Sequence, residues 1–421
     1  MAQEAKKSSF WLIVFAVCVI GIGAYLGIYY LSRSRQVSNA CAPFHLAAAG
    51  IDALLPAYPF KYTEYWVWSA VPSDKPIVYK ATGRYPYSRG MNYQAYDSAN
   101  TLPADTIVDY NIVPDQGSSN PFLPNINRYV ENRSYTVWFT PPAYTTGKQN
   151  VLLMPDTTVN GTENATMIYR IIRHDPVDHL PLPTIEAFDA ATGQPVPCPR
   201  QGMPLHISTV VQAFKELFHV KVPVESPTFE FYRYNPDRFI PNTSTHYLTA
   251  AISPPDEGKL AGVWYRVPTF TDTYHDRNAM FTGKEEVRHS GICIHGLYST
   301  TGVECPVDDE FPVGKDGVRM AYIIVGPDDD GVRKEAERRG YKYLHTGHFK
   351  YPLVMYRQRL PRSDFAGSAE KILSAEPTRL DPSVAASRYM GEYAPRGHVC
   401  TRDSFMSGNT CGLPTLTQES R

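Results

Sequence analysis

The chain has 421 residues and a formal net charge of −1 at pH 7. Because basic and acidic side chains balance, the composition excludes the strongly basic surface with which proteins bind nucleic acid or anionic lipid. Tyrosine and proline are abundant, with 29 and 36 residues, and long stretches of helical periodicity are scarce. These features indicate a mainly β body with many loops.

The first predicted element is a transmembrane helix at residues 10–31, after a cytoplasmic tail of residues 1–9. The stretch has no charged side chain, and as a helix it is about 30 Å long, which matches the hydrocarbon core of a bilayer. No clear cleavage site follows, so we interpret it as an uncleaved signal anchor in contact with membrane lipid. Gly21, Gly23 and Gly27 predict close packing against another helix.

The cysteines indicate the compartment of the remaining chain. Six lie outside the predicted span, at Cys41, Cys198, Cys293, Cys305, Cys400 and Cys411. An even number suits an oxidising compartment, so we expect the C-terminal part to be extracytoplasmic, either periplasmic or at the cell surface. Four Asn-x-Ser/Thr triplets agree with this location and are candidate glycosylation sites, at Asn132, Asn160, Asn164 and Asn242.

The spacing of the cysteines predicts three disulfides. Cys293 and Cys305 flank a turn, and we favour a disulfide that closes a hairpin. The alternative is a metal site with His295, but two cysteines and one histidine give at most three ligands, without the Cys-x-x-Cys spacing of structural zinc. Cys400 and Cys411 are expected to close a second local loop, which leaves Cys41 to pair with Cys198.

The body is expected to begin after a linker at residues 32–58 with a short helix at 47–55. A first β unit covers residues 59–200, and its alternating or apolar runs predict strands at residues 65–70, 77–81, 91–96, 106–112, 135–140, 150–154 and 165–172. A connection at 201–260 contains an amphipathic helix at 207–218. A second β unit follows at 261–375, and an extended C-terminal tail at 376–421.

The second β unit repeats the plan of the first. Residues 78–80, 135–138 and 167–170 resemble residues 264–266, 322–325 and 354–357, in order and at nearly one spacing. We interpret this as two copies of one unit with the same strand order. The alternative is that Tyr-rich strands resemble one another by chance. The expected fold is mainly β: two related β-sandwich or jelly-roll-like units in tandem, with few short helices, one of them capped by residues 328–330 and ended by Gly340.

The stretches GRYPYSRGMNYQAYDSAN, VRHSGICIHGLYSTTGVECPVDDEFPV and YPLVMYRQRLPRSDF carry a family resemblance. The chain from about residue 75 to 375 resembles a family of exported bacterial proteins of unknown function, with β domains similar to the domain of unknown function DUF1214. The resemblance implies a fold and no particular reaction. Departures lie at residues 344–349 and in the tail after residue 376.

Three groups of residues are candidates for chemistry or binding. A loop with His174, Asp178 and His179 offers ligands for a divalent metal. Asp308, Asp309 and Glu310, with Glu304, offer carboxylates for glycoside cleavage, which requires that one of them be buried. Aromatic side chains suit sugar stacking or a protein interface, and the candidates are Tyr85, Tyr87, Tyr93 and Tyr96. No nucleotide loop, haem motif or Gly-x-Ser-x-Gly occurs, so no catalytic residue or cofactor is predicted.

These patterns favour a non-enzymatic accessory or scaffold subunit of a membrane or cell-surface assembly, held through protein partners or self-association. The first alternative is a carbohydrate-binding or carbohydrate-active envelope protein. The second is a metal-dependent enzyme built around residues 174–179.

Overall fold

The computed structural model describes residues 39–49, 58–97, 102–157, 164–175, 182–199, 228–233, 242–251, 258–297, 301–349, 351–375 and 386–416. The described residues from Ala40 onward belong to one compact unit. The predicted span with Gly21, Gly23 and Gly27 and the predicted helix at 207–218 lie outside the described residues. Within the described residues, no helix has the length and apolar character needed to cross a membrane.

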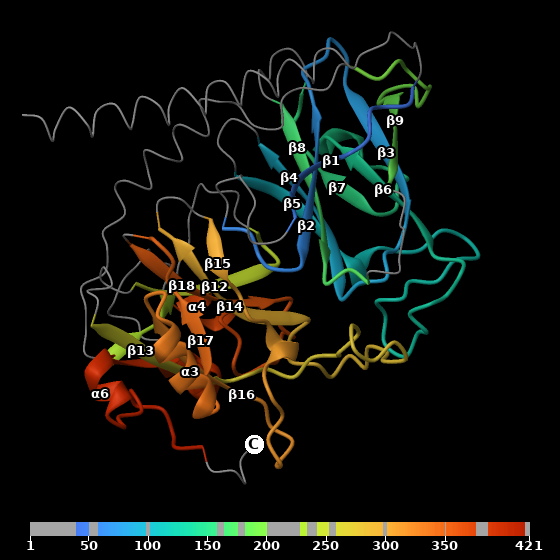
Figure 1. Ribbon diagram of the computed structural model, residues 1–421. Coiled ribbons are helices and arrows are strands. Elements are labelled where there is room, and N and C mark those ends of the chain that lie inside the picture. The colour runs from blue at the N-terminus through green and yellow to red at the C-terminus, as the bar shows by residue number, and fades with distance from the viewer. Residues whose placement is uncertain are drawn as a thin grey trace, which may run out of the picture. The chain divides into compact units, whose positions relative to one another are not determined.

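The first half of the body forms two β-sheets (Figure 1). One sheet has the strand order β1-β2-β8-β4-β5 and the other the order β7-β6-β3-β9. The elements are β1 (His45–Ala49), β2 (Thr63–Ala70), β3 (Ile77–Arg84), β4 (Gly90–Asp97), β5 (Pro103–Val108), η1 (Asp109–Asn111), β6 (Ser134–Thr140), η2 (Pro142–Tyr144), β7 (Val151–Leu153), β8 (Ala165–Ile172) and β9 (Thr184–Asp189).

The second half forms two further sheets, with the orders β11-β12-β18-β14-β15 and β10-β19-β13-β16-β17. Its strands are β10 (Thr228–Glu230), β11 (Tyr232–Arg233), β12 (Thr245–Ala251), β13 (Lys259–Arg266), β14 (His289–Gly296), β15 (Gly302–Glu304), β16 (Met320–Gly326), β17 (Lys342–His345), β18 (Pro352–Arg359) and β19 (Arg396–Thr401). Its helices are η3 (Asp308–Glu310), α3 (Asp330–Arg338), α4 (Glu370–Ala375), α5 (Ser387–Met390), η4 (Gly391–Tyr393) and α6 (Arg402–Met406).

The two halves have the same strand order. The row β2-β8-β4-β5 corresponds to β12-β18-β14-β15, and β7-β6-β3-β9 corresponds to β17-β16-β13-β19. In each half one pair is parallel, β6 with β7 and β16 with β17. Residues 135–138 and 322–325 therefore lie in equivalent strands, as do residues 167–170 and 354–357, and the predicted equivalence of these strands is confirmed.

Each pair of sheets encloses an apolar core, as in a β-sandwich. In the first half Tyr93 stacks on Tyr169 with ring centroids 4.6 Å apart, and both side chains are fully buried. In the second half Tyr265 and Tyr356 pack edge to face at 4.9 Å. Each fully buried side chain of this size contributes about 1.5–3 kcal/mol, so these alternating strands are held chiefly by their inward faces.

Strands β8, β14 and β18 are buried at every position. One face of each strand lines the core of its own half, and side chains on the other face of β14 and β18 contact the opposite half. Arg359 of β18 donates to Asn92 of β4 at 2.8 Å, and Arg357 of the same strand donates to the Tyr58 carbonyl oxygen at 2.7 Å. The halves are therefore joined through one sheet of each.

The three predicted disulfides are confirmed. The structure pairs Cys41 with Cys198, Cys293 with Cys305, and Cys400 with Cys411. The predicted α3 is also confirmed. Asp329 caps it by accepting from the amides of Gly331 and Val332, and Gly340 follows its end with a φ of 85°.

Two predictions of local structure are wrong. The helix expected at 47–55 is replaced at its start by β1, which pairs with β2 because sheet hydrogen bonds outweigh the helix propensity of alanine. The tail after residue 376 is not simply extended, since β19 pairs with β13 and β10. Gly262 of β13 makes room for this tail, because a Cβ there would collide with the Cys411 carbonyl oxygen.

Candidate functional site

A largely buried group of acidic and basic side chains lies where the two halves meet. We call it the Arg89 cluster, and its members are Arg89, Arg173, Asp272, Asp308 and Asp309. Arg89 immediately precedes β4, and its side chain is fully buried. It forms ion pairs with Asp308, with Asp309 at 2.8 Å and with Asp272 at 3.5 Å. A side chain from the first half thus contacts three carboxylates from the second.

Asp308 opens η3 and is fully buried. Its Oδ2 accepts from the Ser290 amide at 2.7 Å, and its Oδ1 accepts from the Asp309 amide at 2.9 Å. Burial alone would raise the pKa of Asp308, but the Arg89 charge and these hydrogen bonds lower it below its usual range. The carboxylate is therefore ionised although it has no contact with solvent.

His289 lies beside this ion pair as a neutral ring. Burial lowers its pKa, and the Asp308 charge only partly opposes that effect. His289 Nδ1 lies 3.0 Å from Arg89 Nη1 and 3.1 Å from Asp308 Oδ2, and the Phe60 ring packs against the imidazole with centroids 5.0 Å apart. His289 therefore packs against both members of the ion pair without adding a charge.

Asp309 is shared by two arginines. Its Oδ2 accepts from Arg89 and also from Arg173, whose Nη2 and Nε lie 3.0 Å and 3.1 Å away. The Asp309 side chain is fully covered, although its backbone is partly exposed. The Arg173 guanidinium is packed between the rings of Tyr62 and Tyr274, at 3.7 Å and 3.8 Å from their centroids. Arg89 and Arg173 are therefore both held at the same oxygen, Asp309 Oδ2.

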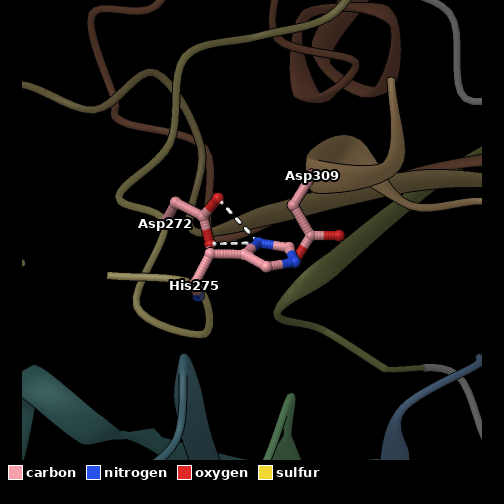
Figure 2. Close-up of side chains that lie close together, drawn as sticks. All are labelled: Asp272, His275 and Asp309. Carbon is pink, nitrogen blue, oxygen red and sulfur yellow. Dashed lines mark hydrogen bonds and ion pairs between the residues drawn. The ribbon is translucent and has the colours of Figure 1, made fainter. Parts of the chain in front are cut away.

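The loop between β13 and β14 brings Asp272 and His275 to the same carboxylate. Figure 2 shows the His275 ring between Asp272 and Asp309. His275 Nδ1 lies 3.0 Å from Asp272 Oδ2, and the His275 amide donates to Asp272 Oδ1 at 3.2 Å. Although burial opposes it, these hydrogen bonds lower the pKa of Asp272. One donor atom from each of the three side chains lies within 4.8 Å of the others.

The cluster has a weaker counterpart with the halves exchanged. Arg288 precedes β14 as Arg89 precedes β4, and Asp109 opens η1 as Asp308 opens η3. Arg288 of the second half lies 3.4 Å from Asp109 of the first. Asp109 also accepts from the Met91 amide at 3.0 Å, as Asp308 does from Ser290. Each half therefore donates one arginine to the aspartate of the other.

A second buried region between the halves contains arginines with different partners. We call Arg170, Arg357 and Arg359 the arginine layer, and all three are at most 4% exposed. Arg170 donates to the Tyr96 hydroxyl at 2.6 Å, and Arg357 donates to His295 at 3.1 Å. Within the described part of the chain, none of the three has a carboxylate at ion-pair distance. Burial, with the nearby Arg170 charge, lowers the pKa of Arg359 to about 10.

The metal ligands and glycosylation sites proposed from the sequence differ in their partners and in their exposure to solvent. His174 pairs with Glu64 at 3.0 Å, while Asp178 and His179 lie outside the described residues. Asn132 is exposed, and Asn242 is partly exposed. Asn164 is only 9% exposed, which is against its prediction as a glycosylation site, and Asn160 lies outside the described residues.

The prediction of an exposed aromatic surface is wrong for three of its four tyrosines. Tyr85, Tyr93 and Tyr96 are buried, while Tyr87 is half-buried and covered by Arg133 at 3.7 Å from its ring centroid. Strand alternation shows which side chains share a face, but not whether that face meets solvent or a core. The glycoside-cleavage hypothesis required a buried carboxylate among Asp308, Asp309 and Glu310, and the sequence does not reveal burial. In the structure the side chains of Asp308 and Asp309 are buried.

Sequence reasoning missed Arg89, Arg173, Asp272 and His275. The repeat offered one signal, since Arg89 and Arg288 hold the same place before equivalent strands. Asp272 and His275 lie in a long loop that has no such counterpart among the matched stretches. Their association with Asp309 arises only when distant loops fold together.

Comparisons with known proteins add little about activity. No family model matches the chain, and no curated protein matches it. A structure of an uncharacterised protein from Burkholderia cenocepacia is similar, with a TM-score of 0.46 and 11% identity over 85% of this chain and 81% of that one. A protein from Vibrio parahaemolyticus has a TM-score of 0.41 and 9% identity over 87% and 92%. The resemblance to DUF1214 therefore stays a prediction.

Proposed function

We propose that this chain is an exported, single-span membrane protein whose two related β-sandwich units in tandem serve as a non-catalytic accessory or scaffold subunit of a membrane or cell-surface assembly. Three disulfides support an oxidising, extracytoplasmic location for the body. The uncharged stretch at residues 10–31 supports the anchor.

The observation that carries this proposal is a pair of neighbouring loops with exposed apolar side chains. Leu123 lies in the loop before β6 and is 37% exposed, and Met280 lies in the loop before β14 and is 44% exposed. The amide of Asn125 donates to the Phe281 carbonyl oxygen at 2.7 Å, which ties the two loops together. Beneath them Phe122 stacks on Phe281 with centroids 6.0 Å apart. Apolar side chains displayed on a fixed support suit a protein partner.

The test is to extract the full chain from its native membrane in mild detergent and identify the proteins that remain bound. The variant Leu123→Asp/Met280→Asp should lose those proteins while keeping the melting temperature of the wild type. Val313→Asp is the matched control, because Val313 is 49% exposed in a different loop. A wild-type chain that sediments as a lone monomer, or a double variant that retains every partner, would refute the proposal.

The rings of Tyr62 and Tyr274 favour carbohydrate binding as a second candidate. They are 37% and 39% exposed, and both lie against Arg173 beside the buried Asp309 carboxylate. Aromatic faces next to charged hydrogen-bonding groups suit the recognition of a sugar. Screening the purified chain against immobilised oligosaccharides tests this candidate. Binding that is lost in Tyr274→Ala and kept in Tyr110→Ala, at a tyrosine that is 44% exposed elsewhere, would place it ahead of the scaffold function.

A further inference from the structure

We propose that Asp272, His275 and Asp309 form a binding site for one divalent transition-metal cation, for which Zn²⁺ is the appropriate probe. This site is independent of the scaffold function, since the exposed loops around Leu123 and Met280 do not supply its ligands. It is also distinct from the loop at residues 174–179 that the sequence suggested for a metal.

The geometry of the donors supports the site. One donor atom from each residue lies within 4.8 Å of the other two. A cation about 2.1 Å from each donor holds them at most ~4.2 Å apart, so a small adjustment brings them to bonding distance. The His275 side chain is 57% exposed, so solvent leaves room for that adjustment. In Figure 2 the ring already lies between the two carboxylates.

An independent observation is an unsatisfied oxygen on Asp309. The two arginines both bind Oδ2, whereas Oδ1 is buried and has no hydrogen-bond partner among the described residues. The side chain that carries it is fully covered. A buried carboxylate oxygen without a partner costs about 1–3 kcal/mol or more, because it has lost water and gained nothing. A cation that binds Asp309 through Oδ1 would satisfy this oxygen.

The balance of charge points in the same direction. Three carboxylates in the cluster, those of Asp272, Asp308 and Asp309, face only two guanidinium groups, those of Arg89 and Arg173. One negative charge is left at the edge of the cluster. A divalent cation neutralises it, whereas an anion would add to it.

The site is open on the side of His275 and Asp272. The Asp272 side chain is 26% exposed and that of His275 is 57% exposed, so an ion can enter from solvent and keep water in its remaining positions. One imidazole nitrogen with two carboxylate oxygens suits Zn²⁺ or Mn²⁺ rather than the softer ions that prefer thiolates. The three-ligand set with an open position would leave the bound ion accessible to a small molecule.

The experiment measures Zn²⁺ binding by the full chain in detergent, stripped of metal and then titrated calorimetrically. We expect one Zn²⁺ per chain. His275→Gln and Asp272→Asn should each weaken binding by more than about tenfold. These residues are partly exposed, so the variants should keep the melting temperature of the metal-free wild type.

His348→Gln is the matched control, because His348 is exposed but does not belong to the cluster. It should bind Zn²⁺ as the wild type does. Titration with Co²⁺ gives a second readout, since d–d absorption bands that appear in the wild type and are absent in His275→Gln report a nitrogen ligand at the ion. No Zn²⁺ binding by the wild type, or equal binding by His275→Gln, would overturn the proposal.

Discussion

The Arg89 cluster and the arginine layer both bury arginines between the two halves, but they treat the charge in opposite ways. Arg89 is met by three carboxylates, which raise its pKa although burial acts to lower it. Arg359 has an amide oxygen as its partner and no carboxylate among the described residues, and burial lowers its pKa to about 10. In both regions the guanidinium fixes one half to the other. The comparison shows that a buried guanidinium group can hold its hydrogen bonds across the two halves whether or not carboxylates neutralise its charge.

The same substitution in the two regions should give very different results, and the larger effect is expected at Arg89. Arg89→Met would leave Asp308 and Asp309 buried without their shared counter-ion. Removing one partner of a buried ion pair costs about 3–5 kcal/mol. Denaturant unfolding of the full chain in detergent, followed by tryptophan fluorescence, measures this loss. A loss below about 1 kcal/mol would show that the cluster does not join the halves.

A smaller effect is expected from pH, and it arises at His289 beside the Arg89 cluster. His289 faces Arg89, Asp308 and the Phe60 ring, and burial lowers its pKa in the folded chain. Below about pH 6.5 the unfolded chain therefore binds a proton that the folded chain does not, so stability is lost as the pH falls. The free energy of unfolding should decrease by up to about 1.4 kcal/mol per pH unit until the folded-state pKa is reached.

The variant His289→Asn isolates this contribution, because its side-chain amide offers both a donor and an acceptor to the neighbours of Nδ1 and does not titrate. The slope between pH 6.5 and 5 should become shallower in this variant and stay unchanged in His348→Gln, where the histidine is exposed. Identical slopes in His289→Asn and the wild type would contradict a neutral, buried His289.

The smallest effect is expected at Arg359. Arg359→Met removes the hydrogen bond to Asn92 but also removes a buried charge that has no carboxylate partner. Replacing such a charge by an apolar side chain of similar volume is often neutral, so the free energy of unfolding should change by no more than about 1 kcal/mol. The measurement is the one used for Arg89→Met. A loss as large as the one expected there would mean that the arginine layer carries the junction.

The strands were largely predictable because local patterns determine them. Residues 165–172 form a strand with the bounds expected from their apolar run, and their counterpart is the strand predicted from the repeat. The disulfides were predictable because only six cysteines lie outside the span and two pairs are close in sequence. The strands could be predicted from short stretches of sequence, and the disulfides from the number and spacing of the cysteines.

The candidate site could be predicted only in part. Asp308 and Asp309 are recognisable in the sequence as adjacent carboxylates. Arg89, which forms ion pairs with both, lies 219 residues from Asp308 in the sequence. Tyr93 was assigned to a surface because tyrosine suits one, whereas it stacks on Tyr169 in the core. Side-chain burial and long-range pairing depend on how the sheets pack, and no local pattern reports that.

The place of β19 determines when the second half can be completed during synthesis. The first half has its last strand, β9, at an edge, and all its strands precede residue 200. In the second half β19 lies between β10 and β13, although it follows all the other described strands in the chain. Until β19 is synthesised, β13 has an open edge, which invites pairing with another chain. Synthesis therefore yields the strands of the N-terminal sandwich first, whereas the second sandwich waits for residues 396–401, and a chain interrupted before them would be a target for chaperones and proteases.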